Sequence, residues 1–423
     1  MKYYAVCGSP ILHSLSPQIF QQLFATNNYD SCYTRLLCDN ADDAIILYKA
    51  LNLSGMNITA PLKHNIMHHC NSCTGDAKRI DAINTIVTYR NQLLGFNTDW
   101  EGVLNTLRLA DIDIQSKKIL VIGAGNSAAS AIFGIIQFFP NADITITNRS
   151  EKNGMALANK FNLHYTPLDA DLQQYSLIIN TIPQPELVNL NFHKEATILF
   201  ANYTSHSYFS KISSKYNIII GLQWLINQAI PAFEYFISND DYCKKVDLSN
   251  EIINEYYTKC NNGNIYLTGF SGSGKSYIGE RIAKNLHLEF VDTDELVVAQ
   301  AGKSIPAIFA DDGEQAFRNY ETEVLTQVGR TNRRVVALGG GCLQSQHNVE
   351  LAKRSGVVIY LYSELEGCLA RIDKQSRPML NATDKKIESL YNQRMDGYLV
   401  ASDMVVASHS AEALLTSSFS IHL

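Results

Sequence analysis

Two glycine-rich loops of different types constrain the fold of this 423-residue chain. The first is Gly123-Ala124-Gly125-Asn126-Ser127-Ala128, after the apolar run 118–122, and the second is Gly269-Phe270-Ser271-Gly272-Ser273-Gly274-Lys275-Ser276, after 265–268. In each, a strand-like segment leads through glycines into a helix-like segment, which places phosphate groups at a helix N-terminus. The first pattern is typical of dinucleotide pyrophosphate binding and the second of ATP or GTP binding. The sequence therefore predicts two nucleotide sites and two reactions.

Composition and charge narrow the class of protein. The chain has 46% apolar and 18% charged residues, which is typical of a globular protein, and its length suits two or three domains. A net charge of −6 without a long basic stretch argues against nucleic acid as a partner. No apolar run reaches the ~18–20 residues that cross a bilayer, and the N-terminus lacks the shape of a signal peptide. Nine cysteines, an odd number, indicate free thiols in a reducing compartment, so we expect a cytoplasmic protein of undetermined oligomeric state.

Strand-like and helix-like segments alternate along the chain, which is typical of α/β architecture with mostly parallel sheets. The Asn-Asn-Gly-Asn stretch at 261–264 has the composition of a turn or linker. Strands are expected at 2–7, 31–37, 118–122, 143–147, 176–181, 196–201 and 217–221, and helices at 17–27, 41–52, from about 126, and at 224–238.

The end of the strand 143–147 indicates the type of dinucleotide. An NAD site usually places a carboxylate there to bind the ribose 2′-hydroxyl. This chain has Asn148 and Arg149 instead, with Lys152 close behind, and an arginine binds a 2′-phosphate in forked geometry. NADP(H) is therefore favoured, and Arg149 as a solvated loop residue is the alternative. The predicted NADP(H)-binding residues are Gly123, Gly125, Asn126, Asn148 and Arg149.

Five further motifs between residue 1 and about residue 240 resemble those of shikimate dehydrogenases. In chain order they are Gly8-Ser9-Pro10-Ile11-Leu12-His13-Ser14-Leu15-Ser16-Pro17, Gly55-Met56-Asn57-Ile58-Thr59-Ala60-Pro61-Leu62-Lys63, Ala82-Ile83-Asn84-Thr85, Gly95-Phe96-Asn97-Thr98-Asp99-Trp100-Glu101-Gly102 and Gly221-Leu222-Gln223-Trp224-Leu225 with Gln228-Ala229. The resemblance implies reduction of the ring ketone of 3-dehydroshikimate by NADPH, with Lys63 and Asp99 as the catalytic pair at the reacting oxygen. It also implies that Ser14 and Ser16 hold the substrate carboxylate, while Thr59, Asn84 and Gln228 contact the ring hydroxyls.

The chain departs from this family pattern at four places. Asn126 stands where the family usually has a glycine, and Trp224 stands where it has a methionine. An aspartate and a proline of the family are missing around 200–205, and the stretch 181–183 also differs. All four lie on the nicotinamide side or at the domain interface, so we expect them to affect cofactor affinity and turnover more than substrate identity.

The second glycine loop is a complete P-loop. Its backbone N–H groups, including those at Gly272 and Gly274, form an anion-binding nest, Lys275 reaches the outer phosphates, and the Ser276 hydroxyl binds Mg²⁺. The motifs that follow resemble shikimate kinases over 265–407: Phe290-Val291-Asp292-Thr293-Asp294, Gly313-Glu314-Gln315-Ala316-Phe317-Arg318-Asn319-Tyr320-Glu321, Ala337-Leu338-Gly339-Gly340-Gly341, Arg377-Pro378-Met379-Leu380, and Arg394 with Tyr398.

This second resemblance implies a role for each matched residue. Asp294 hydrogen-bonds the acceptor hydroxyl, and Asp292 holds Mg²⁺ beside Ser276. Arg318 and Arg394 bind the acceptor carboxylate, Gly340 presents its backbone N–H, and Arg377 is a lid arginine over the phosphates. A surface ion pair of Arg318 with Glu314 or Glu321 is the structural alternative.

Together the two resemblances predict an α/β protein with an N-terminal α/β substrate domain and a Rossmann NADP domain, followed by a P-loop domain like the nucleoside-monophosphate kinases. The expected boundaries are 1–245 for the dehydrogenase (substrate part about 1–100 and 223–240, Rossmann part about 101–222), 246–264 for a linker, and 265–423 for the kinase. The expected function is bifunctional: reduction of 3-dehydroshikimate with NADPH, then phosphorylation of shikimate with ATP and Mg²⁺. Two alternatives stay open, a quinate/shikimate dehydrogenase fused to the kinase, and an active kinase with a degenerate dehydrogenase-like ligand-binding domain.

Overall fold

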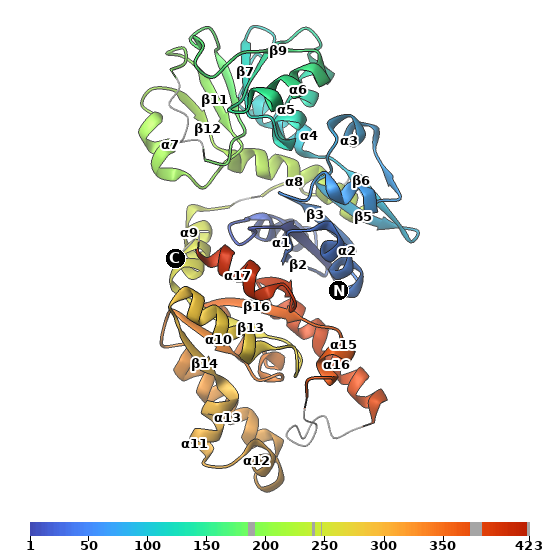
Figure 1. Cartoon of the computed structure of the whole chain (residues 1–423), viewed down its shortest axis with the longest axis vertical. Coiled ribbons are helices and arrows are strands. Elements are labelled where there is room, and N and C mark those ends of the chain that lie inside the picture. Colours follow the sequence, from blue (N-terminus) through green and yellow to red (C-terminus); the bar gives the residue numbers. More distant parts are fainter. Residues whose placement is uncertain (185–190, 239–241, 247, 373–382, 421–423) are drawn as a thin grey trace. The chain divides into compact units, whose positions relative to one another are not determined.

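The computed structural model describes residues 1–184, 191–238, 242–246, 248–372 and 383–420 (Figure 1). The chain divides into two compact units. Unit 1 contains residues 1–17, 31–53 and 248–423, and unit 2 contains residues 18–30 and 54–247. Unit 1 therefore joins the first strands of the N-terminal half to the P-loop half, whereas we expected the P-loop domain to begin at 265.

Parallel strands form the centre of unit 1, in the order β14-β15-β13-β16-β17-β2-β1. The first five follow the order 2-3-1-4-5 of the P-loop half, and β17 continues into β2 through the pair Val405–Leu36. Apart from the edge strand β14, their apolar residues are largely buried, as expected for parallel strands covered on both faces. The bounds are β1 Lys2–Gly8, β2 Ser31–Leu37, β13 Asn264–Thr268, β14 Glu289–Asp292, β15 Arg334–Ala337, β16 Gly356–Tyr362 and β17 Met404–Ala407.

The helices of unit 1 pack on this sheet and on one another. Helix α10 follows the P-loop, contacts β13, β14 and β15, and lies beside α17 (Figure 1). We expected a linker over 246–264, but helix α9 occupies most of it, capped by the Ser249 hydroxyl and packed on β16. The bounds are α2 Ala41–Ala50, α9 Asn250–Asn262, α10 Lys275–Leu286, α11 Thr293–Ala301, α12 Ile305–Asp311, α13 Gly313–Val328, α14 Gln346–Ser355, α15 Leu365–Leu369, α16 Asp384–Ala401 and α17 Ala411–Ser420, with a 3-10 turn η3 at Cys342–Gln344.

Unit 2 contains a Rossmann sheet with the strand order β12-β11-β10-β7-β8-β9. In chain order this is 6-5-4-1-2-3, the doubly wound arrangement that binds a dinucleotide where the strand order reverses. Apolar clusters fill both faces, with α5 contributing six buried apolar residues to one of them. The bounds are β7 Lys118–Ile122, α5 Asn126–Phe138, β8 Asp143–Thr147, α6 Glu151–Phe161, β9 His164–Tyr165, β10 Leu177–Asn180, β11 Thr197–Phe200, α7 His206–Ile212 and β12 Asn217–Ile219.

A smaller, partly antiparallel sheet in unit 2 carries the order β3-β5-β6-β4. The expected, mostly parallel pattern did not predict its β5–β6 hairpin, which turns through Arg90 and Asn91 at φ 49° and 61°. Helices α4 and α8 pack on each other beside it. The bounds are α1 Ser16–Thr26 (which begins in unit 1), β3 Gly55–Ile58, η1 Asn65–His69, β4 Ser72–Cys73, α3 Gly75–Ile80, β5 Thr85–Tyr89, β6 Gln92–Phe96, α4 Asp99–Leu109 and α8 Gly221–Ile237.

The predicted α/β class is confirmed, and the strands expected at 2–7, 31–37, 118–122, 143–147 and 196–201 occur within a residue or two. In the part of the chain that the structure describes, no helix is long and apolar enough to span a membrane.

Candidate active sites

The predicted catalytic pair of the N-terminal half is assembled in unit 2. Lys63 lies in the loop after β3, and Asp99 is the first residue of α4. The Lys63 Nζ is 2.5 Å from the Asp99 Oδ2, and both side chains are about nine-tenths buried. The Ile83 N–H donates to the Lys63 carbonyl oxygen and ties that loop to the strand that follows. A lysine and a carboxylate in direct contact form a proton-transfer pair next to any hydroxyl or carbonyl that reaches them.

Asn84 links this pair to Gln228, another predicted ring-binding residue. Its amide nitrogen donates to the Asp99 Oδ1 and to the Gln228 Oε1, each at 3.0 Å. Its amide oxygen accepts from the Thr98 N–H at 2.8 Å. These buried side chains form one network, so the orientation of each depends on the others. Sequence reasoning missed Thr98, although the Asn-Thr-Asp run before α4 contains it.

Trp224 holds the first turn of α4. Its indole N–H donates to the Asp99 carbonyl oxygen at 2.9 Å, and the ring is 5% exposed. The ring packs where a Cβ on Gly102 would be, because such an atom would lie 2.8 Å from the Trp224 Cδ1 and 2.7 Å from the Gln228 Cβ. The tryptophan therefore supports the position of Asp99.

The remaining predicted substrate residues lie outside this network. Thr59 is half-buried directly after β3 in unit 2. Ser14 and Ser16 belong to unit 1, where both are buried and their hydroxyl oxygens are 3.2 Å apart.

The first glycine loop has the geometry of a pyrophosphate site. Gly123 has φ 112°, and a Cβ there would lie 2.3 Å from the Thr181 Oγ1. Among the described residues, no atom lies within 4 Å of a Cβ position on Gly125, and no side chain caps the N-terminus of α5. Asn126 begins that helix. An uncapped helix of 13 residues with open space before it fits a bound pyrophosphate.

The strand β8 ends beside the predicted 2′-phosphate residues. Arg149 and Lys152 are exposed, and the Asn148 amide donates to the Ser150 carbonyl oxygen at 2.9 Å. The Ser150 hydroxyl caps α6 by accepting from the Asn153 N–H. This edge carries cations and no carboxylate at the end of the strand, which suits a 2′-phosphate.

The second glycine loop is tightly packed, both against a neighbouring backbone segment and against the side chain of its own lysine. Gly272 has φ 79°, and a Cβ there would lie 2.3 Å from the Cys368 carbonyl oxygen. Gly274 precedes α10, and the Lys275 Nζ donates to the carbonyl oxygens of Gly269 and Phe270 at 2.8 and 3.1 Å. The Ser276 hydroxyl donates to the Asp292 Oδ2 at 2.6 Å, so the two predicted Mg²⁺-binding side chains are in contact. These oxygen donors fit a hard divalent cation.

The predicted acceptor residues of the P-loop half lie around the triple-glycine turn. A Cβ on Gly339 would lie 2.7 Å from both the Asp294 Oδ1 and the Glu321 Oε1. A Cβ on Gly340 would lie 3.5 Å from an Arg394 guanidinium nitrogen, and one on Gly341 would lie 2.5 Å from an Arg318 guanidinium nitrogen. Two carboxylates and two guanidinium groups therefore meet at one backbone turn.

The ion-pair alternative for Arg318 is also present. Its guanidinium is 2.5 Å from the Glu321 Oε2 and 2.9 Å from the Glu314 Oε1. Glu321 is buried, its Oε1 has no hydrogen-bond partner among the described residues, and burial raises the pKa of its carboxyl while Arg318 opposes that rise. The pairing and the binding role are compatible, because the ion pairs hold the guanidinium against the glycine turn.

Comparisons with known proteins agree with this geometry. Family models described as the shikimate dehydrogenase substrate binding domain, shikimate / quinate 5-dehydrogenase and shikimate kinase match residues 6–86, 106–198 and 271–420. The shikimate kinase of Chlorobaculum tepidum is 43% identical over 34% of this chain and 82% of its own length. The shikimate dehydrogenase (NADP(+)) of Nitrosopumilus maritimus is 31% identical over 55% of this chain and 92% of its own length.

The chain belongs to the shikimate dehydrogenase and shikimate kinase families. A solved structure supports the first assignment: shikimate dehydrogenase from Aquifex aeolicus matches 60% of this chain and 97% of its own, with a TM-score of 0.53 and 26% identity.

Two features of the kinase half qualify the predicted site. Arg377, the expected lid arginine, lies outside the described residues. Arg371 donates to the Gly272 carbonyl oxygen at 2.9 Å and to the Ser363 hydroxyl at 3.2 Å, so a second arginine lies against the P-loop.

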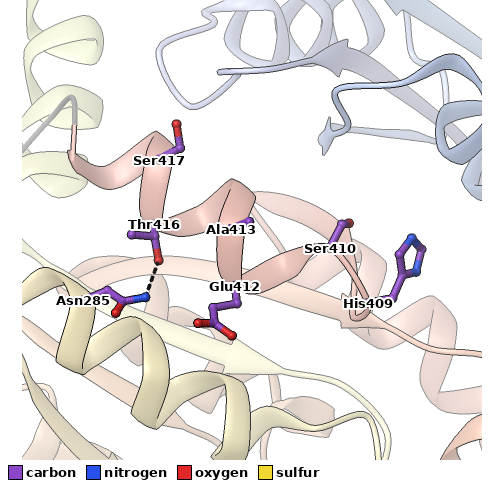
Figure 2. A pocket seen from close by; sticks show the side chains of 7 residues that line it. All are labelled: Asn285, His409, Ser410, Glu412, Ala413, Thr416 and Ser417. Carbon is purple, nitrogen blue, oxygen red and sulfur yellow. Dashed lines mark hydrogen bonds between the residues drawn. The ribbon is translucent and has the colours of Figure 1, made fainter.

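A surface depression of about 560 Å³ on the kinase half does not coincide with the predicted phosphate-binding and acceptor residues (Figure 2). It lies along α17 and at the C-terminal end of α10, whereas Lys275 and Ser276 begin α10. The Asn285 amide donates to the Thr416 hydroxyl at 3.4 Å across it (Figure 2). Its lining residues are Asn285, His409, Ser410, Glu412, Ala413, Thr416 and Ser417.

Proposed function

We propose that this chain catalyses two consecutive reactions: NADPH-dependent reduction of 3-dehydroshikimate to shikimate, and Mg²⁺- and ATP-dependent phosphorylation of shikimate at its 3-hydroxyl. The observation that supports the proposal is that each half brings several of its predicted site residues into contact. Lys63, Asp99 and Asn84 are in contact in unit 2, and Asp294, Arg318 and Arg394 surround the glycine turn in unit 1.

In the dehydrogenase reaction, NADPH supplies the hydride. We propose that Lys63 and Asp99 hold and deliver the proton for the nascent alkoxide, because their contact and burial keep that proton at the reacting oxygen. Asn84, Gln228 and Thr59 orient the ring hydroxyls, and Ser14 and Ser16 bind the carboxylate. Gly123, Gly125, Asn126, Asn148 and Arg149 bind NADP(H).

In the kinase reaction, ATP with Mg²⁺ supplies the phosphoryl group. We propose that Asp294 accepts the proton of the acceptor hydroxyl and that Arg318, Arg394 and the Gly340 N–H bind the acidic acceptor. Gly272, Gly274 and Lys275 cradle the phosphates, Ser276 and Asp292 hold the metal ion, and Arg377 closes over the phosphates. Catalysis of this kind depends mainly on positioning and charge neutralisation.

Single-site variants test the assignment of the two reactions. Lys63→Ala should lower the dehydrogenase kcat by about 10²- to 10⁴-fold and leave the kinase kcat unchanged, because general acid–base catalysis is lost at one site only. Lys275→Ala should lower kinase activity by roughly 10²- to 10³-fold through the loss of a charge at the phosphates, with the dehydrogenase unchanged.

Exposed lysines on neighbouring helices serve as controls for these variants. Lys78→Ala on α3 and Lys284→Ala on α10 should leave both activities unchanged. Loss of both activities in either active-site variant would contradict the assignment of separate sites.

A quinate-oxidising dehydrogenase is a second candidate, because one matching family model covers shikimate and quinate enzymes together. Steady-state oxidation rates with the two acids distinguish the candidates, and a higher kcat/KM for quinate would replace our choice. We place the enzyme in the cytoplasm, a proposal supported by its nine free cysteines.

A further inference from the structure

The loop that carries Ser14 is held by side chains that lie close to the kinase half of unit 1. This loop, residues 11–16, connects β1 to α1 and contains no regular secondary structure before Ser16. Its own backbone closes through the Ser14 N–H, which donates to the Ile11 carbonyl oxygen at 3.0 Å. Ile11, Leu12 and Leu15 are buried, so the loop is fixed among packed side chains.

Arg35 makes the first of these contacts. Its Nε and Nη2 both donate to the Ser14 carbonyl oxygen, at 3.1 and 2.5 Å, and its Nη1 donates to the Asp403 carbonyl oxygen at 3.3 Å. Asp403 lies in the turn between α16 and β17. Arg35 is 2% exposed and therefore links the loop that carries Ser14 to the kinase sheet from a buried position.

Helix α9 makes the second set of contacts. The Tyr256 hydroxyl donates to the Leu12 carbonyl oxygen at 2.6 Å, and the Tyr257 hydroxyl donates to the His13 carbonyl oxygen at 3.1 Å. The Tyr256 ring also lies under the Arg35 guanidinium, with 4.4 Å between Cζ and the ring centroid. Three consecutive carbonyl oxygens, those of residues 12, 13 and 14, thus accept from α9 and Arg35.

Helix α9 is anchored in turn on the kinase half. The Lys259 Nζ is 3.0 Å from the Asp403 Oδ1, and the Asp403 Oδ2 accepts from the Val358 N–H of β16 at 3.0 Å. Helix α9, in the stretch that we expected to be a linker, therefore connects strand β16 of the kinase half to the loop that carries Ser14 through a continuous series of contacts.

We propose that Arg35, Tyr256 and Tyr257 are positioning residues of the dehydrogenase, which set the affinity for the substrate carboxylate by fixing the backbone that carries Ser14. The proposal rests on the proposed function, in which Ser14 and Ser16 bind that carboxylate. Contacts to an unreacting carboxylate stabilise the ground state and the transition state equally, so their loss raises KM and leaves kcat unchanged.

Hydroxyl removal from the two tyrosines tests the proposal in the full chain. Tyr256→Phe and Tyr257→Phe should each raise the dehydrogenase KM for shikimate roughly fivefold, and the double variant should raise it more than tenfold, because each removes one hydrogen bond to the loop. The dehydrogenase kcat, the KM for NADP⁺ and the kinase KM for shikimate should stay within about twofold of the wild-type values. The reason is that the variants weaken only the binding of the substrate carboxylate, which is equally strong in the ground state and the transition state.

Two further variants separate positioning from general destabilisation. Tyr266→Phe removes a buried hydroxyl that lies 2.7 Å from the Ser355 Oγ in the kinase sheet, and it should leave the dehydrogenase KM unchanged even where the melting temperature falls. Arg35→Lys keeps the charge but loses the paired contact with the Ser14 carbonyl oxygen, and it should raise the same KM as the tyrosine variants do.

The outcomes distinguish this inference from the proposed function. Absence of shikimate oxidation by the wild-type chain would overturn the proposed function itself. Normal wild-type turnover together with an unchanged KM in the double tyrosine variant would overturn the positioning role. The role would also be overturned if kcat of that variant fell by the same factor as its kcat/KM, because KM would then be unchanged.

Discussion

At the scale of single residues, the contacts of Asp99 connect the predicted site residues of the dehydrogenase half. Its side chain contacts Lys63 and Asn84, and its carbonyl oxygen accepts from the Trp224 indole. The sequence motifs named the first two and predicted their role. They did not predict the Trp224 contact, because a residue that departs from a family pattern carries no signal of its new partner. Trp224, the departure from the family pattern that we expected to affect turnover, thus contacts the proposed catalytic residue Asp99 directly.

Trp224→Phe should lower the dehydrogenase kcat several-fold and reduce the free energy of unfolding by about 1–3 kcal/mol, because a buried hydrogen bond and part of a packed ring are lost. Kinase kcat should not change. Steady-state assays of the two reactions measure the kcat values, and urea unfolding of the same preparation measures the free energy of unfolding.

Trp100→Phe is the matched control for this variant. The Trp100 indole also donates a hydrogen bond, to the Asp76 Oδ2 at 2.9 Å, and its ring packs on Phe133 and Phe138. It should lose comparable stability and keep its dehydrogenase kcat. Equal kcat values in the two variants would contradict a supporting role for Trp224.

Among the elements, the packing of α4 on α8 produces an acidic cluster. The pKa of Glu101 on α4 is raised to about 7, mainly by burial and further by the charges of Glu234 on α8 and Asp76 on α3. Glu234 is also paired with Lys244 at 2.8 Å. A carboxyl whose folded pKa exceeds its unfolded value of 4.5 binds its proton more tightly in the folded state. Its contribution to stability therefore falls as the pH rises from about 4.5 to about 7.

Glu101→Gln should remove this dependence. At pH 8 the variant should be more stable than the wild type by on the order of 1–2 kcal/mol, and the difference should vanish near pH 4.5. The chain's two tryptophans, Trp100 and Trp224, both lie in unit 2, so their fluorescence during urea unfolding reports on that unit. Glu195→Gln, at an exposed position, is the control. A variant that is less stable than the wild type at pH 8 would contradict the assigned cluster.

The elements also show where sequence patterns suffice and where they do not. Apolar runs and glycine loops predicted β7, β8, β13 and the helices after the loops, because local periodicity and turn chemistry determine them. They did not predict the β5–β6 hairpin, since its turn is Arg-Asn rather than a glycine-containing pair. They also did not predict that α9 packs on β16, because its polar composition conceals the few buried residues Ile253, Tyr256 and Cys260.

For the whole molecule, the two motif sets name consecutive reactions, and the structure assembles most of their residues independently. The pairing of β17 with β2 adds that the first strands of the chain are part of the same compact unit as the kinase. No sequence pattern indicates this pairing, because parallel strands from distant segments leave no local signal. The motifs therefore divide the chain into a dehydrogenase half and a kinase half, whereas the compact units place the first strands of the dehydrogenase half with the kinase.

The central claim is that one chain carries both activities on one metabolite. Its most direct test supplies the purified chain with 3-dehydroshikimate, NADPH, ATP and Mg²⁺, and follows NADPH oxidation and shikimate 3-phosphate formation together. We predict that both occur, that omission of ATP leaves NADPH oxidation intact, and that omission of NADPH stops phosphorylation until shikimate is added. Phosphorylation of added shikimate without any NADPH oxidation would contradict the claim and leave an active kinase joined to a degenerate dehydrogenase-like domain.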